Sequence, residues 1–400
     1  MAFLSTRVAR ARLTASAAAT QRVRELRAAG VDIVALTQGE PDFNTPDHII
    51  EAAHRAMHAD QTHYTPVDGT PELKAAIVEK FRRENGIECR PENVSVGAGG
   101  KQVLYNALMS TLDPGDEVLI PAPSWIAYAD LTQFAEGVPI LLLTRPEDGF
   151  KLRAEDLERA ITPRSKWLML NSPSNPSGAV YSEVEYRNLA AVLERHPELW
   201  IISDEIYEHI RYDGAPCVSF AAVAPQLAAR TLTVNGLSKS FAMTGWRLGY
   251  ACGAVELIGA MRRMQGQSTL NPSSVSQAAA VAALTGPMDI VESRCEEFKT
   301  RRDFIVPRLS GIPGLRCTAP QGAFYVYVSC KDWLGRRTPE GGRLTSDADV
   351  SDYLLSQGIS VPNGQGYGLS PYFRVSFASA MDNLEEACRR IEAAAQRIST

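Results

Sequence analysis

Paired cysteines, long apolar runs and blocks of like charge are all missing from this sequence. Its seven cysteines are scattered, and none has the C-x-x-C spacing of a zinc or dithiol site. An odd, scattered set does not suit a disulfide framework, so we expect a reducing, cytoplasmic setting and no metal site. No apolar run approaches the ~20 residues that span a membrane. Arg7, Arg10 and Arg12 interrupt the apolar start, so we expect no signal peptide and no membrane partner.

Charge is spread evenly along the chain. The net charge is −5, and no basic block marks a surface for nucleic acid, so we expect no such partner. Hydrophobic residues make up 45% and charged residues 22% of the sequence, the balance of a globular protein. A length of 400 residues suits a large domain with a smaller one.

Short apolar runs alternate with helical patterns from about residue 46 to residue 285. They lack strict alternation, as do strands that are buried on both faces of a parallel sheet. The runs are Glu117–Ile120, Pro139–Leu143, Trp167–Leu170, Trp200–Ser203, Thr231–Val234 and Leu248–Cys252. Helical stretches such as Ser182–Arg195 lie between most of them. The pattern predicts an α/β domain with a mostly parallel central sheet.

The last hundred residues have a different pattern. A long helical segment over 288–309 is followed by strands at 324–328 and 373–377 and by helices at 347–357 and 383–398. This order indicates a separate α+β layer. The first 45 residues precede the first α/β unit, so we expect them to pack with that layer. The predicted division is a large domain at 46–287 and a small domain made of 1–45 and 288–400.

Glycines, amides, an aromatic ring, an acid, a phenol and a lysine follow the ends of these strands. In an open α/β sheet, ligands bind outside the carboxyl ends of the strands. The segments are Gly99–Lys101, Ser124–Trp125, Asn171–Asn175, Asp204–Tyr207 and Asn235–Lys239. Such a set suits an anionic, planar, aromatic ligand. The glycine turn before the helix at 101–112 offers backbone N–H groups to a phosphate, although a glycine turn can also be loop geometry alone.

Lys239 lies just after a buried-strand run, among few charges. A lysine whose pKa is lowered by its surroundings can form a Schiff base with an aldehyde, and Ser238 and Arg247 are suited to a phosphate. Asp204 closes another strand. There it is either a helix N-cap or loop carboxylate, or the acid that keeps a pyridine nitrogen protonated and the ring a better electron sink. Tyr207 follows three residues later, within reach of a ring hydroxyl.

Together these strings resemble the fold-type I enzymes that use pyridoxal 5′-phosphate (PLP), and within them the class I aminotransferases of the bacterial aspartate/prephenate branch. The similarity extends over essentially the whole chain, including FRVSFA at Phe373–Ala378. The segments that carry it are LTQGEPDFNTP (Leu36–Pro46), GAGGKQVLYN (Gly97–Asn106), NSPSNPSGAVY (Asn171–Tyr181), SDEIYEH (Ser203–His209) and NGLSKSFAMTGWRLGYACG (Asn235–Gly253).

The resemblance implies a role for each site residue. Lys239 holds PLP as a Schiff base, Asp204 pairs with the pyridinium nitrogen, and Trp125 stacks on the ring. Tyr207 and Asn175 bind the ring oxygen. The phosphate lies among Gly100, Lys101, Ser238 and Arg247. Tyr64 is similar to the tyrosine that reaches the phosphate of a neighbouring subunit, which implies an obligate homodimer with shared sites.

Substrate recognition is implied in the same way. Arg374 matches the arginine that clamps the substrate α-carboxylate, a task that suits a planar guanidinium, and Gly39 lies where the backbone approaches the substrate. Lys101 resembles a lysine that reads a second carboxylate. The chain departs from the family pattern at Arg12–Ser16, where Lys and Pro become Arg and Leu, and at Asn363-Gly364, where relatives have Pro-Gly.

The implied reaction is ping-pong transfer of an amino group from an amino acid, aspartate or glutamate first, to a 2-oxo acid. Prephenate is an alternative acceptor, and Arg12 is a candidate for binding it. A PLP-dependent lyase on the same fold would share every cofactor residue. A regulatory module fused to a DNA-binding domain is a further alternative, but no helix-turn-helix segment or basic extension is present.

Overall fold

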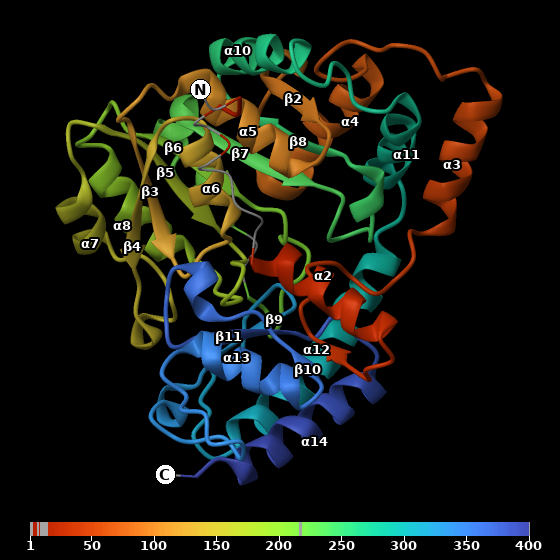
Figure 1. Ribbon diagram of the computed structural model, residues 1–400. Coiled ribbons are helices and arrows are strands. Elements are labelled where there is room, and N and C mark those ends of the chain that lie inside the picture. Colours follow the sequence, from red (N-terminus) through yellow and green to blue (C-terminus); the bar gives the residue numbers. More distant parts are fainter. Residues whose placement is uncertain (1–2, 6–7, 9–14, 216–217, 400) are drawn as a thin grey trace.

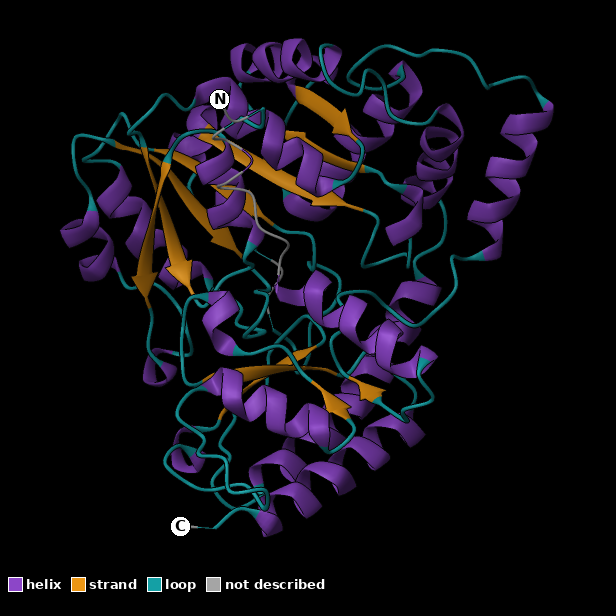
Figure 2. Ribbon diagram, in the orientation of Figure 1, coloured by secondary structure: helices purple, strands orange, loops and turns teal. Residues whose placement is uncertain are grey.

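The computed structural model describes residues 3–5, 8, 15–215 and 218–399. Figure 1 shows an α/β part that holds the central sheet and, below it, a smaller part that is built mostly from C-terminal residues, coloured blue, together with the red helix α2 (Ala15–Ala28). Helices flank the central sheet, as Figure 2 shows. Within the described residues, no helix is both long enough and apolar enough to cross a bilayer.

The central sheet has seven strands in the order β2-β8-β7-β6-β5-β3-β4. All its pairs are parallel except those of β8, which is antiparallel to both β2 and β7. Every residue of β2, β7 and β8 is buried, as expected for strands covered on both faces. The bounds are β2 (Val94–Gly97), β3 (Glu117–Ala122), β4 (Val138–Leu143), β5 (Ser165–Asn171), β6 (Trp200–Asp204), β7 (Thr231–Gly236) and β8 (Gly249–Cys252). The mostly parallel sheet is confirmed.

The helices of this part begin where the sequence offers caps. Ser182 accepts a hydrogen bond from the Glu185 N–H, and the Glu185 carboxylate accepts one from the Ser182 N–H, so this capping box starts α8. The helices are α3 (Asp47–His58), α4 (Pro71–Lys80), α5 (Gly100–Thr111), α6 (Ala127–Phe134), α7 (Ala154–Ala160), α8 (Glu183–Leu193), α9 (Phe220–Val223), α10 (Val255–Gly266) and α11 (Ser274–Thr285). A π-helical turn (Phe81–Asn85) follows α4, and 3₁₀ turns lie at Pro91–Asn93, Pro146–Asp148, Pro225–Arg230 and Thr244–Trp246.

The smaller part has two short sheets. Strands β9 (Tyr325–Ser329) and β11 (Tyr372–Ser376) pair antiparallel. Strand β1 (Val34–Ala35) pairs with β10 (Ile359–Ser360), so the chain near residue 34 lies with the C-terminal residues. The remaining elements are α2 (Ala15–Ala28), α12 (Asp289–Ser310), α13 (Asp347–Ser356), α14 (Met381–Arg397) and 3₁₀ turns at Lys331–Trp333 and Gly364–Tyr367.

Helix α12 connects the two parts. Val291, near its start, packs in the core formed by α3, α4 and α11, whereas Phe298, two turns later, packs with β9, β11 and α14. Tyr207 and Tyr212 of the large part also belong to this second core. This second core thus contains residues from both parts of the chain. The division at residues 45/46 and 287/288 stays a prediction.

Candidate active site

A cavity of about 420 Å³ opens at the carboxyl edge of the central sheet and is closed by side chains of the smaller part. Its volume lies within the roughly 300–1,000 Å³ of small-molecule sites. Every site residue predicted from the sequence lines it except Tyr64 and Arg12: Gly39, Gly100, Lys101, Trp125, Asn175, Asp204, Tyr207, Ser238, Lys239, Arg247 and Arg374. The geometry brings these residues together, and their individual roles stay predictions.

Lys239 follows β7 and reaches across to the other part of the chain. Its ammonium group donates a hydrogen bond to the Gly39 carbonyl and lies 5.9 Å from the centre of the Tyr207 ring. Removal from water lowers the pKa of Lys239 to about 8, against an opposing effect of Glu40. Relative to an ordinary lysine, such a shift raises the neutral fraction at pH 7 by roughly 300-fold. The neutral amine is the form that attacks an aldehyde or accepts a proton.

Asp204 ends β6 and is buried. The Tyr128 hydroxyl donates to its Oδ2 at 2.8 Å, and the Ile206 N–H donates to its Oδ1 at 3.2 Å. Burial nevertheless raises the pKa of Asp204 to about 6, because the carboxylate has lost its water. A cationic ring nitrogen beside Asp204 would supply the charge partner that a buried carboxylate needs.

The antiparallel direction of β8 brings together Ser238, Arg247 and the N-terminus of α5. We call this group, which is suited to binding an anion, the anion seat. Gly249, the first residue of β8, pairs with Gly97 at the end of β2 and with Gly236 at the end of β7. Arg247, Ser238 and the N-terminus of α5 therefore meet at one edge. Arg247 is fixed there by a hydrogen bond from its Nη1 to the Thr244 carbonyl at 2.9 Å.

Two glycines of this seat have no room for a side chain. A Cβ on Gly249 would lie 2.2 Å from the Gly100 nitrogen. A Cβ on Gly99, whose φ is +92°, would lie 2.5 Å from Arg247 Nη2. Since the first N–H groups of α5 have no partner within the helix, backbone and guanidinium together suit a phosphate.

Arg374 lies on β11 and is buried. It donates from Nη1 to Asn175 Oδ1 at 3.1 Å and from Nη2 to the Thr37 carbonyl at 2.7 Å, and it stacks 4.3 Å from the centre of the Tyr325 ring. Its Nε is buried and has no hydrogen-bond partner among the described residues. An unpaired buried donor of this kind is costly, and a carboxylate in the cavity would satisfy it.

The sequence analysis missed several residues of the cavity wall. Tyr128 holds Asp204, and the Tyr325 hydroxyl lies 2.9 Å from the Tyr207 hydroxyl. Tyr367 lies 5.3 Å from the Arg374 guanidinium, measured from the ring centre. The available signal was weak, because a tyrosine within an apolar strand or helix has the same pattern as a core aromatic residue.

Lys101 and Trp125 form one side of the cavity. The ammonium group of Lys101 lies 4.9 Å from the centre of the Trp125 ring, a cation–π distance. Burial lowers the pKa of Lys101, against an opposing effect of Asp130. Lys101, an exposed residue, thus offers a cation at the wall of the cavity.

Three positions that the sequence singled out lie at or beyond the edge of this arrangement. Tyr64 is 88% exposed and does not line the cavity of its own chain. Arg12 lies outside the described residues. Asn363 has a local role, since its Oδ1 accepts a hydrogen bond from the Gly366 N–H at 3.3 Å and caps the turn that carries Tyr367.

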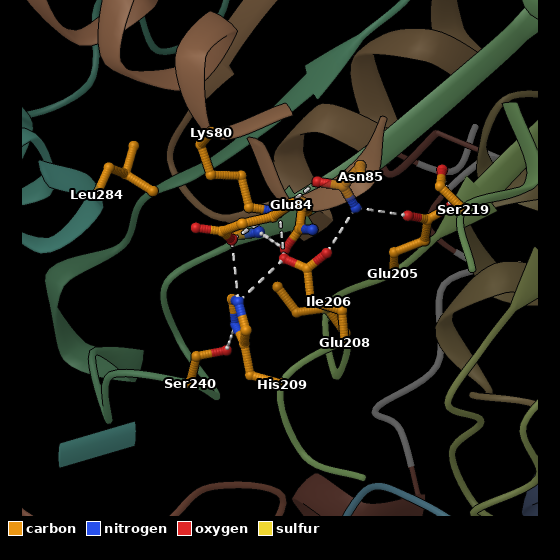
Figure 3. A network of polar contacts seen from close by, with 12 residues as sticks. Lys80, Glu84, Asn85, Glu205, Ile206, Glu208, His209, Ser219, Ser240 and Leu284 are labelled. Atoms are coloured by element: carbon orange, nitrogen blue, oxygen red, sulfur yellow. Dashed lines mark hydrogen bonds and ion pairs between the residues drawn. The ribbon is translucent and has the colours of Figure 1, made fainter. Parts of the chain in front are cut away.

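A buried charge network includes Glu205 and Glu208, which follow Asp204 in the chain (Figure 3). The Lys80 ammonium group pairs with Glu208 and donates to Asn85 Oδ1 at 2.7 Å. The Asn85 amide donates to Glu208 Oε2 at 2.7 Å and to Glu205 Oε2 at 3.1 Å. Burial raises the pKa of Glu205 to about 7. Burial also acts to raise the pKa of Glu208, but Lys80, His209 and Asn85 together outweigh this effect, and the pKa is lowered.

The same network connects to the loop that carries Lys239. His209 Nδ1 lies 2.8 Å from the hydroxyl of Ser240, the residue after Lys239, and its Nε2 lies 3.0 Å from Glu84. The segment that carries Asp204 and the loop that carries Lys239 are therefore joined through buried polar contacts as well as through the paired strands β6 and β7.

Comparison with known proteins agrees with this geometry. The model of the family "Aminotransferase class I and II" matches residues 31–391. An aspartate aminotransferase of Rhizobium meliloti is 51% identical over 94% of this chain and 92% of its own. An aspartate/prephenate aminotransferase of Cereibacter sphaeroides is 51% identical over 98% of both chains.

Solved structures show the same likeness. The crystal structure of the Rhizobium meliloti aspartate aminotransferase has a TM-score of 0.97 at 48% identity and covers all of both chains. That of the Thermus thermophilus aspartate aminotransferase with maleate has a TM-score of 0.92 at 42% identity, over 98% of this chain and 100% of that one. The fold-type I prediction is confirmed, and the comparisons favour amino-group transfer over a lyase reaction. The chain belongs to the class I and II aminotransferases.

Proposed function

We propose that this aminotransferase uses PLP bound to Lys239 and moves the amino group of aspartate or glutamate to a 2-oxo acid, 2-oxoglutarate or oxaloacetate. The observation that carries the proposal is the unpaired Nε of Arg374. It offers a carboxylate contact in the same cavity as a lysine with a lowered pKa, a buried acid and an anion seat.

The residues present fit the cofactor. Asp204 would hold the ring nitrogen, Lys239 would bind the aldehyde carbon, and the N–H groups at Gly100 with Ser238 and Arg247 would hold the phosphate. Trp125 would cover one face of the ring. The need for glycine at positions 99 and 249 supports this assignment, because a side chain at either would fill the anion seat.

When bound, PLP supplies an aldehyde that takes up the amino group and a ring that withdraws electrons from the substrate Cα. The chain supplies the rest. Arg374 binds the α-carboxylate and, with Asn175, fixes its orientation. Lys239 Nζ, poised to lose its proton near pH 8, accepts the proton of the substrate Cα and later returns it. The carboxylate of Asp204 keeps the ring nitrogen positively charged throughout.

A dicarboxylic substrate is supported by the cavity and by the relatives. Lys101 places a second cation in the cavity, beside Trp125. The relatives named above are aspartate aminotransferases, and the Thermus enzyme was solved with maleate, a dicarboxylate. We infer that the ammonium group of Lys101 binds the side-chain carboxylate of the substrate.

We further propose that the enzyme is a homodimer of the cytoplasm. Tyr64 is exposed and faces no part of its own cavity, which suits a side chain that completes the phosphate site of a partner. Light scattering tests this, and an active monomer would contradict it. The described cysteines are free thiols, in keeping with a reducing compartment.

The test is a panel of amino donors and oxo acids on purified protein. We expect aspartate and 2-oxoglutarate to give glutamate and oxaloacetate in equal amounts, with prephenate as a further acceptor in the panel. Activity should vanish in Lys239→Ala. Release of ammonia without an acceptor would refute amino-group transfer, and turnover of monocarboxylic substrates alone would refute the role of Lys101.

A further inference from the structure

Two exposed histidines face each other on α3, a helix at the periphery of the large part (Figure 1). His54 and His58 are four residues apart, so their side chains lie one turn apart on the same face. Their Nε2 atoms are 3.1 Å from each other, and the ring planes meet at 87°. We propose that His54 and His58 form a chelating site for a divalent transition-metal ion such as Ni²⁺ or Zn²⁺.

The helix places both rings toward solvent. The opposite side of α3 is buried, through Ile49 and Ala53, against the alanines of α11. The α3 backbone is therefore anchored by packing that does not involve the histidines. A metal ion would meet two ligands whose backbone is already fixed, so less order is lost on binding.

The separation of the two nitrogens matches a shared ion. Zinc–imidazole bonds are about 2.0–2.1 Å long. With both nitrogens bound at such a length, a separation of 3.1 Å subtends about 98° at the ion. This angle lies between the right angle of square-planar or octahedral sites and the tetrahedral angle. No movement of the helix is needed to close the chelate.

Glu51 supplies an outer contact. Its Oε2 lies 4.0 Å from His54 Nδ1, the ring nitrogen that faces away from His58. This distance is too long for a hydrogen bond, but a carboxylate on that side attracts a cation bound by the two rings.

The two imidazole ligands determine which metal ions the site prefers, and the residue between them decides whether a bound ion could catalyse hydrolysis. Imidazole suits zinc, nickel and copper, whereas magnesium and calcium prefer oxygen ligands. The spacing is that of H-E-x-x-H, but Arg55 stands where that motif has its general base. Water would complete the coordination shell. We therefore assign metal binding and no hydrolytic activity.

The other group of potential ligands carries no such proposal. Glu84, Glu208 and His209 lie close enough to hold an ion, but the Lys80 ammonium group already pairs with Glu208 and lies 3.7 Å from Glu84. The positive charge there is supplied by the chain itself.

Equilibrium dialysis of the PLP-loaded enzyme against NiCl₂, and separately against ZnCl₂ and MgCl₂, tests the proposal. At Ni²⁺ concentrations near the Kd of the wild-type site, we expect the wild type to bind up to one more Ni²⁺ per chain than either His54→Gln or His58→Gln. The Kd for this site should be at least tenfold higher in each variant. His63→Gln, which removes another exposed histidine close in sequence, should bind as the wild type does. Mg²⁺ should not bind at this site.

The outcomes separate cleanly. Equal Ni²⁺ binding by the wild type and both variants, or loss in only one of them, would overturn the proposal, because a chelate needs both rings. Absence of binding in the wild type would overturn it as well. Transaminase activity measured alongside should be unchanged in all three variants, since none of these histidines lines the active-site cavity.

Discussion

Replacement of Lys80 by methionine should strongly destabilise the protein, although Lys80 does not line the active-site cavity. Lys80 pairs with Glu208 inside the protein, and the two side chains are only 1% and 4% exposed. Lys80→Met keeps the apolar stem but leaves the Glu208 carboxylate buried without its cation. Breaking a buried pair by removal of one partner costs about 3–5 kcal/mol. Glu84, which lies 3.7 Å from the same ammonium group, loses a partner too.

The assay is thermal unfolding of PLP-loaded protein, compared among variants at one protein concentration. Lys299→Met is the matched control. Lys299 pairs with Asp303 at 2.8 Å, but its side chain is 35% exposed, so its loss should destabilise the protein far less than the loss of Lys80. The double variant Lys80→Met, Glu208→Gln removes both charges and should recover much of the loss, because the uncompensated charge is gone.

Two results would refute this reasoning. Equal falls in melting temperature for Lys80→Met and Lys299→Met would mean that burial does not set the cost of the missing cation. A double variant no more stable than Lys80→Met would mean that the unpaired carboxylate is not the cause.

Further predictions concern the cavity. In cofactor-free protein, reductive methylation of Lys239, followed by peptide mass spectrometry, should increase with pH around a midpoint of about 8, since burial lowers its pKa; a midpoint near 10 would contradict this. Arg374→Ala should weaken all donors and acceptors alike by roughly 2–5 kcal/mol in kcat/KM with PLP content unchanged, and a loss confined to dicarboxylic substrates would refute its role. Burial raises the pKa of Asp204 from 3.8 to about 6, so its contribution to the stability of cofactor-free protein is present below pH 4 and is lost as pH rises through 6. Asp204→Asn should remove that component, about 3 kcal/mol, from the pH dependence of melting temperature, and identical pH profiles would contradict the shift.

Those parts of the site that follow strand ends could be predicted from the sequence. Asp204 ends one buried apolar strand, and Lys239 follows another within three residues. The carboxyl ends of neighbouring parallel strands lie at the same edge of the sheet. Tyr128 and Tyr325 could not be found in this way. Tyr128 lies on α6 and Tyr325 on β9 of the other sheet, where nothing local distinguishes them from core aromatic residues. Their hydroxyls matter only because the tertiary fold brings them to Asp204 and Tyr207.

Some elements of the fold could likewise be predicted from nearby residues, and others could not. The helix at 183–193 follows from Ser182 and Glu185, which are three residues apart. The antiparallel direction of β8 could not be predicted from its own sequence. A short strand that is buried on both faces has the same hydrophobic pattern whether it is parallel or antiparallel to its neighbours. It is set by its partners, β2 and β7.

The placement of β8 also has a consequence for the order in which the protein matures. Strand β2 lies at the sheet edge, and the one strand that it pairs with in the described part of the chain is β8, which is synthesised roughly 150 residues later. Until the ribosome has released residues 249–252, β2 and the glycine turn after it have no strand to pair with. Contacts at such sequence separation form slowly, because a long loop must close first. The anion seat is thus assembled only after the rest of the sheet has been made, and a nascent chain that stops before residue 249 cannot form it.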